Sequence, residues 1–146
     1  MSKIIVFDVD NTLSNANHRQ HHVQQKPKRW DLFNAKMHED PPQNDIIWLA
    51  QTLHAAGNTI VICSGRGSEN RDVTEKWLIE HDIPFEILYM RKEKDSRRDD
   101  IVKVELLEQI RKDFGEPYLW FDDRKQVVDA IRAQGIRVCQ VQEGDF

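Results

Sequence analysis

Short apolar runs alternate with stretches of helical periodicity along this chain, and this alternation limits the possible folds more than any other feature. Continuous apolar runs are typical of strands buried on both faces of a parallel sheet. Strands that alternate with helices predict an α/β domain, with a parallel sheet of about five strands and helices on both faces. The expected strands are residues 3–7, 58–63, 86–90, 118–121 and 137–141, and the expected helices cover the apolar stripe from Ile46 to Leu53 and about 70–81, 99–114 and 125–134.

Length and composition predict one soluble domain covering residues 1–146, because a chain of 146 residues supports a single core. No apolar run approaches the roughly 20 residues that cross a bilayer, and no signal-peptide pattern opens the sequence. Cys63 and Cys139 lie in apolar runs, which is typical of core residues in a reducing compartment, so we expect a cytoplasmic location. The net charge of −4 argues against extended wrapping by nucleic acid.

The first expected strand ends in two aspartates, Asp8 and Asp10, that are separated by one residue. Ligands of open α/β sheets bind beyond the carboxyl ends of the strands. Two carboxylates at that edge attract a hard cation such as Mg²⁺, which offsets their mutual repulsion. A solvated turn is the alternative for these two residues taken alone, since Asp and Asn are common in turns.

The later strand ends carry further groups suited to phosphate chemistry. Ser64-Gly65-Arg66 follows the second expected strand and combines a hydroxyl, backbone N–H groups and a planar guanidinium. Lys103 lies early in the helix after the third strand, and Asp122-Asp123 follows the fourth. The second acid pair either completes a magnesium site or caps the next helix. Taken singly, these motifs also fit a glycine-rich turn, a charged loop and a helix cap.

Residues 13–40 interrupt the alternation of strands and helices. The part from Ser14 to Trp30 has four permanently basic residues, three histidines and no acid. A long stretch of weak periodicity inside a compact domain is typical of a functional flap or a small cap. A solvated surface loop is the alternative. Trp30 and Phe33 either anchor this flap, which is the commoner use of aromatic side chains, or stack on a nucleobase.

The four strand ends together resemble the motifs of the haloacid dehalogenase superfamily of phosphohydrolases. Asp8-Val9-Asp10-Asn11-Thr12 is similar to the first motif, Ser64 to the second, Lys103 to the third and Asp122-Asp123 to the fourth. The resemblance spans nearly the whole chain and implies a Rossmann-like three-layer sandwich with a minimal cap. Asn11 occupies the usual glycine position of the first motif, and asparagine tolerates the positive φ of such a turn.

A closer resemblance is to the 3′-phosphatase domain of bacteriophage polynucleotide kinase. It implies Mg²⁺-dependent removal of 3′-phosphates from nucleic-acid ends or nucleotides, with a substrate site formed by Ser64, Gly65, Arg66, Arg91 and Arg124. No Gly-x-x-x-x-Gly-Lys loop occurs, so we expect no separate kinase domain in this chain. The residues that carry this resemblance are 64–66, Arg91, 97–103, 122–128 and the final Gly144-Asp145-Phe146.

The resemblance also implies a mechanism in which Asp8 attacks phosphorus and forms an aspartyl-phosphate. Asp10 protonates the leaving alkoxide and then deprotonates the attacking water. Ser64 and Lys103 stabilise charge on the transferring phosphoryl oxygens. The resemblance also implies that magnesium is held by Asp8, Asp122 and the backbone carbonyl of Asp10, with Asp123 supporting this shell.

Three alternatives stay open at this point. The first is a 5′- or 3′-mononucleotidase or another small-molecule phosphatase of the same superfamily. The second is a receiver-like phospho-acceptor module, although in receivers the phosphorylated Asp follows a later strand, whereas Asp8 and Asp10 share the first strand end. The third is a catalytically idle nucleic-acid-binding domain, which the full set of charged groups needed for turnover argues against.

Overall fold

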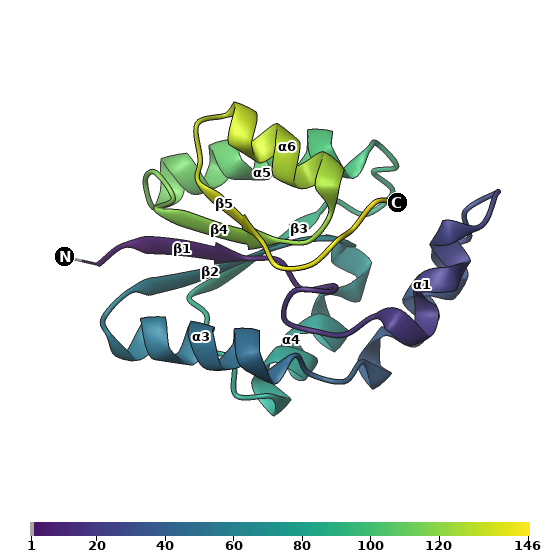
Figure 1. Cartoon of the computed structure of the whole chain (residues 1–146), viewed down its shortest axis with the longest axis horizontal. Coiled ribbons are helices and arrows are strands. Elements are labelled where there is room, and N and C mark those ends of the chain that lie inside the picture. Colours follow the sequence, from purple (N-terminus) through teal and green to yellow (C-terminus); the bar gives the residue numbers. More distant parts are fainter. Residues whose placement is uncertain (1) are drawn as a thin grey trace.

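The computed structural model describes residues 2–146 as a five-stranded sheet with helices on both faces (Figure 1). All neighbouring strands pair in parallel, in the order β3-β2-β1-β4-β5. The predicted α/β architecture with five parallel strands is therefore confirmed. The strands are β1 (Ile4–Phe7), β2 (Thr59–Gly67), β3 (Ile87–Arg91), β4 (Leu119–Asp122) and β5 (Val138–Gln140).

Two pairs of helices cover the two faces of the sheet (Figure 1). The helices α3 (Asn44–Ala55) and α4 (Arg71–Glu80) pack on one face, and α5 (Asp99–Asp113) and α6 (Lys125–Ala133) pack on the other. Successive residues of a strand point to opposite faces, so each strand contributes to both cores. These four helices agree with the predicted positions to within one or two residues.

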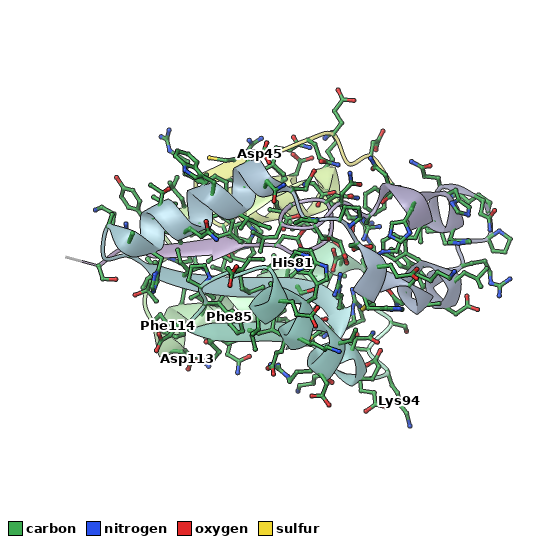
Figure 2. All side chains as sticks on the ribbon, turned by 90° about the horizontal axis from the view of Figure 1, so that it is seen from below. Asp45, His81, Phe85, Lys94, Asp113 and Phe114 are labelled. Atoms are coloured by element: carbon green, nitrogen blue, oxygen red, sulfur yellow. The ribbon has the colours of Figure 1, made fainter. Side chains whose placement is uncertain are left out.

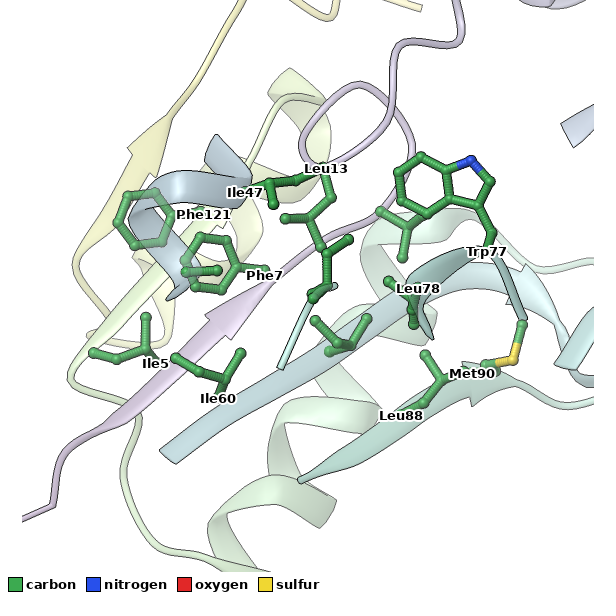
Figure 3. Packing of buried hydrophobic residues seen from close by; sticks show 14 residues of the cluster. Ile5, Phe7, Leu13, Ile47, Ile60, Trp77, Leu78, Leu88, Met90 and Phe121 are labelled. Atoms are coloured by element: carbon green, nitrogen blue, oxygen red, sulfur yellow. The ribbon is translucent and has the colours of Figure 1, made fainter. Parts of the chain in front are cut away.

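The core beneath α3 and α4 is organised around β1 and its neighbours (Figure 3). The rings of Phe7 and Phe121 stack at 4.7 Å between centroids, which joins β1 to β4. Trp77 and Leu78 of α4 are almost fully buried against the same cluster. Because β1 lies at the centre of the sheet and is buried on both faces, the turn that follows it has a rigid support.

The helix α5 runs along the length of the sheet in the direction opposite to the strands. Asp113 and Phe114, at its end, lie at one end of the molecule in Figure 2, and Lys94, in the loop before it, lies at the other. The first turns of α5 therefore lie at the carboxyl edge of the sheet. This direction brings Lys103, in the second turn, to the same edge as the turn after β1.

Residues 13–40 contain two helices that the sequence did not predict, α1 (Asn17–Gln24) and α2 (Trp30–Ala35), followed by a short 3-10 helix at Met37–Glu39. We refer to residues 13–40 as the arm. Its helix α1 projects beyond the carboxyl edge of the sheet (Figure 1). A small separate core of Ala16, Val23 and Phe33, with Phe146 packed against it, holds this segment. Residues 13–40, expected as a flap, thus form a helical arm beside the carboxyl edge of the sheet.

The glycine-rich motif after the second strand differs from its expected form. The strand β2 continues through Ser64-Gly65-Arg66 to Gly67, with an irregular register against β3 between Ser64 and Gly67. The second strand was expected to end at Cys63 and extends four residues further, so the alternative of a glycine-rich turn at this motif does not hold. Asn11, by contrast, has a φ of 61°, as expected for a residue in a glycine position.

No helix within residues 2–146 is long and apolar enough to cross a membrane. Cys63 is buried in the core and Cys139 is partly buried, and both thiols are free.

Candidate active site

Asp8 lies at the end of β1 with both carboxylate oxygens held in place. The Lys103 ammonium donates to Oδ1 at 2.9 Å, and the Thr12 hydroxyl donates to Oδ2 at 3.1 Å. The backbone N–H of Asp8 donates to the carbonyl of Phe121 at 3.0 Å, which continues the pairing between β1 and β4. The side chain is therefore oriented before any ligand binds, as a nucleophile requires.

Asp122, at the end of β4, faces Asp8 across the Lys103 ammonium. The Lys103 Nζ donates to Oδ2 of Asp122 at 2.8 Å, and the indole of Trp120 donates to the same oxygen at 3.2 Å. The N–H of Asp123 donates to Oδ1 at 2.9 Å. The structure thus brings together Asp8, Asp122 and Lys103, as predicted from their strand ends.

Asp8, Asp122 and Asp123 form a buried cluster of carboxylates with the composition of a metal site. One oxygen from each lies within 4.8 Å of the others. Asp123 Oδ2 is buried and has no hydrogen-bond partner among the described residues, which is costly unless a ligand compensates. The alternative in which the acid pair caps the next helix does not hold, because Arg124 is at the N-cap and no side chain caps α6.

Burial and repulsion from neighbouring carboxylates make Asp8 and Asp123 hard to ionise in the absence of a cation. Burial and the neighbouring Asp122 raise the pKa of Asp8 to about 7, against the opposing effect of Lys103. Burial, Asp8 and Asp122 also raise the pKa of Asp123 well above its usual value. A divalent cation would reverse both effects. Its usual ligands are carboxylate oxygens, so this cluster fits Mg²⁺.

Asp10 lies apart from this cluster and contacts two arginines instead. The Arg66 guanidinium donates to its carboxylate at 2.7 Å, and Arg19 donates to the same Oδ1 atom. Burial alone would raise the pKa of Asp10, but Arg66 and Arg19 outweigh it and hold that pKa well below its usual range. Asp10 is therefore a carboxylate at neutral pH in the free protein. Its side chain is outside the carboxylate cluster that fits a metal.

Arg19 is a site residue that was not predicted as one, because the sequence indicated it only as one of the basic residues of the flap. Its side chain is 2% exposed and bridges Asp10 to Asp40 by hydrogen bonds from Nε and Nη2. Its Nη1 atom donates to the carbonyl of Phe33 at 3.0 Å. Asp40 also accepts a hydrogen bond from His18 and is completely buried. The arm thus positions Asp10 through Arg19.

Ser64 and Gly65 lie next to these groups on β2. The Ser64 hydroxyl accepts a hydrogen bond from the backbone N–H of Arg66 at 3.1 Å, and its side chain is fully buried. A Cβ atom at Gly65 would collide with the carboxylate of Asp99. Only glycine therefore allows Asp99 to approach this strand so closely.

The remaining predicted substrate residues, Arg91 and Arg124, line the cavity but are already engaged with protein groups. Arg91 donates to the carbonyls of Gly65 and Asp95 at 2.9 and 3.1 Å and to Asp99 at 3.2 Å. Arg124 donates to the carbonyl of Phe146 at 3.0 Å and lies 3.5 Å from Asp99. In this arrangement Arg91 holds the loop before α5 against β2.

These groups surround a cavity of about 700 Å³, a size typical of ligand sites. Its acidic residues include Asp8, Asp10, Asp122 and Asp123, which come from two strand ends, together with Glu69, Asp95 and Asp99. Its basic residues come from β2, β3, the arm, the loop before α5 and the N-cap of α6. Lys103 and Ser64 are buried next to these groups and are not among the residues that line the cavity. Trp30, Phe33 and Phe146 add an aromatic section to the same cavity.

The family model for the polynucleotide kinase PNKP phosphatase domain matches residues 2–146. The chain belongs to this family. As a member it is a phosphatase of the haloacid dehalogenase type, as the resemblance of its motifs implied.

The solved structures agree with this membership. Two chains from structures of the Pnkp1/Rnl/Hen1 complex, one of them described as an RNA repair complex, are 29% identical to this chain, with TM-scores of 0.85 and 0.82. All of this chain is covered, but it spans only 44% and 48% of those chains. A haloacid dehalogenase-like hydrolase from Streptococcus pneumoniae is 16% identical, with a TM-score of 0.67 over 95% of this chain and 84% of that one. The last comparison shows the shared fold.

Proposed function

We propose that this domain is a divalent-cation-dependent phosphomonoesterase that removes 3′-phosphates from nucleic-acid ends through an aspartyl-phosphate on Asp8. The observation that carries the proposal is the convergence of Asp8, Asp122 and Lys103 at one end of the cavity, with hydrogen bonds of 2.9 and 2.8 Å. This arrangement combines an oriented carboxylate with fixed positive charge, which is what phosphoryl transfer requires.

In the first step, Asp8 attacks phosphorus while the bond to the leaving oxygen breaks. Thr12 and Lys103 fix the direction of the carboxylate, and Lys103 adds positive charge beside the reacting oxygens. Mg²⁺ held by Asp8, Asp122 and Asp123 would neutralise charge on the phosphoryl oxygens. In the second step, water attacks the aspartyl-phosphate and releases Asp8 and inorganic phosphate.

Asp10 is the group proposed to move protons in both steps. As a carboxylate it is in the protonation state that can accept the proton of the attacking water, and weaker hydrogen bonds from Arg66 and Arg19 would make it a stronger base. To protonate the leaving oxygen in the first step, it needs a weaker interaction with its arginines. A bound phosphate supplies this, because its oxygens compete for the Arg66 guanidinium.

The proposed substrate class rests on family membership and on the charge of the cavity rim. Lys28, Arg97 and Arg98 line the cavity. Arg97 pairs with Asp95 and Glu105, and Arg98 pairs with Asp100, so Lys28 provides the cation that best suits a phosphodiester backbone. The free thiols of Cys63 and Cys139 agree with a reducing, cytoplasmic location, which forms part of the proposal.

A comparison of initial rates on matched phosphate esters tests this function. The set contains one oligonucleotide phosphorylated at the 3′ end, the same one phosphorylated at the 5′ end, 3′-dTMP, 5′-dTMP and glycerol phosphate. We expect the highest kcat/KM on the 3′-phosphorylated oligonucleotide, with a steep fall as salt rises. Equal or higher values on the mononucleotides would favour a mononucleotidase instead.

A further inference from the structure

Two aromatic residues of α2, Trp30 and Phe33, line the same cavity but have different surroundings. Phe33 is 4% exposed and belongs to the small core of the arm, so it serves as an anchor. Trp30 is 41% exposed and meets Phe33 edge to face at 5.5 Å. A large indole left this exposed at the wall of a ligand cavity has apolar surface available for a partner.

Two cationic side chains lie close to the Trp30 ring at the cavity rim. The Lys28 Nζ atom lies 5.9 Å from the ring centroid, and the Arg124 guanidinium carbon lies 5.5 Å from it. Arg124 also lies 4.6 Å from the centroid of Phe146. Aromatic rings beside cations are the usual elements of a surface that binds single-stranded nucleic acid, where bases stack and phosphates pair with charge.

The positive charge of Lys28 is not neutralised by the protein. Among residues 2–146, no carboxylate forms an ion pair with its ammonium within 4.0 Å. Burial, and then the nearby Arg124, Lys26 and Arg98, lower the pKa of Lys28. Arg98 and Arg124 lie beside the carboxylates of Asp100 and Asp99, so Lys28 is the rim cation whose charge an incoming anion would neutralise.

We propose that Trp30 and Lys28 form a subsite for the terminal nucleotide of the substrate, with the base stacked on the indole and the next phosphodiester bound by the ammonium. The inference rests on the proposed function and makes it more specific, because it favours a polynucleotide end over a mononucleotide. Stacking tolerates every base, so the subsite selects a nucleobase without selecting its identity.

A pair of 3′-phosphorylated oligonucleotides tests the stacking contact. They are identical except that one has thymine on its terminal sugar and the other has an abasic sugar. The quantity measured is the kcat/KM on the thymine substrate divided by the kcat/KM on the abasic substrate. We expect Trp30→Ala to lower this ratio by about tenfold, which lies within the range for base–aromatic stacking. Trp30→Phe keeps a flat ring and should preserve most of the ratio, which also guards against a variant that fails to fold.

Trp48→Ala is the matched control, because Trp48 is 63% exposed on α3 and lies outside the cavity. It should leave the ratio at the value of the unmodified protein. An unchanged ratio in a folded Trp30→Ala protein that cleaves both oligonucleotides would overturn the subsite but leave the proposed function intact. Cleavage of glycerol phosphate without cleavage of either oligonucleotide would defeat the proposed function itself.

The phosphodiester contact has a separate readout in the salt dependence. Lys28→Gln should reduce the slope of log kcat/KM against log salt concentration by about one on the oligonucleotide. On 3′-dTMP, which has no second phosphate, we expect the same slope in both proteins. A Lys28→Gln protein whose slope on the oligonucleotide equals that of the unmodified protein would remove Lys28 from the subsite.

Discussion

The Lys103 ammonium lies between the carboxylates of Asp8 and Asp122 and donates hydrogen bonds to both, at 2.9 and 2.8 Å. Its side chain is 1% exposed. Asp122 and Asp8 raise the pKa of Lys103 well above its usual value, although burial opposes them. Lys103 therefore stays charged and keeps two buried acids from repelling one another across the site.

Lys103→Met should affect both stability and activity. It leaves two buried carboxylates without their cation, and breaking a buried ion pair in this way costs about 3–5 kcal/mol of unfolding free energy. Urea denaturation at neutral pH measures this loss, and steady-state assays should show a fall in kcat of about 10²-fold or more. Lys112→Met, the same change at an exposed position of α5, should alter neither quantity measurably.

Asp10→Asn should lower turnover by an amount that depends on the leaving group of the substrate. An alkoxide needs a proton as it departs, whereas p-nitrophenolate departs without one, so the loss in kcat should be larger on the 3′-phosphorylated oligonucleotide than on p-nitrophenyl phosphate. The measurement is the ratio of the two losses. Equal losses on both substrates would contradict the assignment of Asp10 as the acid.

Asp40→Asn should lower turnover although Asp40 lies outside the cavity. Asp40 is buried and holds Arg19, which in turn holds Asp10, so its loss misplaces the proton donor. We expect kcat to fall by up to about 10²-fold, with a smaller change in KM. Asp31→Asn, at an exposed site where the carboxylate pairs with Arg29, is the control and should behave like the unmodified protein.

Removal of divalent cations should abolish turnover and lower the melting temperature. A cation that binds only the folded state stabilises it by about 2.7 kcal/mol at one hundred times its dissociation constant. Differential scanning fluorimetry with EDTA and then with added Mg²⁺ measures this shift. Asp123→Asn should reduce it, because Asp123 Oδ2 is a buried atom with no hydrogen-bond partner within residues 2–146. A melting temperature indifferent to Mg²⁺ in the unmodified protein would argue against the site.

The sheet, its four flanking helices and the carboxylate cluster were predictable because their signals are local. Apolar runs and helical stripes lie within each element, and the turn after each strand must lie at one edge of a parallel sheet. Residues such as Asp8, Ser64 and Asp122 could therefore be assigned to one edge from their positions in the sequence.

The helices of the arm were not predictable in this way. The helix α1 has the sequence Asn-His-Arg-Gln-His-His-Val-Gln, in which Val23 is the only large apolar residue. It is held by Arg19, whose partners Asp10 and Asp40 lie 9 and 21 residues away. An ion pair between distant residues leaves no periodic pattern, so the charge of Arg19 was interpreted as a solvated or substrate-facing group.

The most direct test of the central claim is to trap phosphate on Asp8. The protein is mixed with Mg²⁺ and a substrate that is radiolabelled in its 3′-phosphate, quenched in acid within the first turnover, and digested for peptide mapping. We predict an acid-stable, hydroxylamine-labile label on the peptide that contains Asp8, and no label in Asp8→Asn. Full turnover with no label on that peptide, together with an active Asp8→Asn protein, would contradict the account.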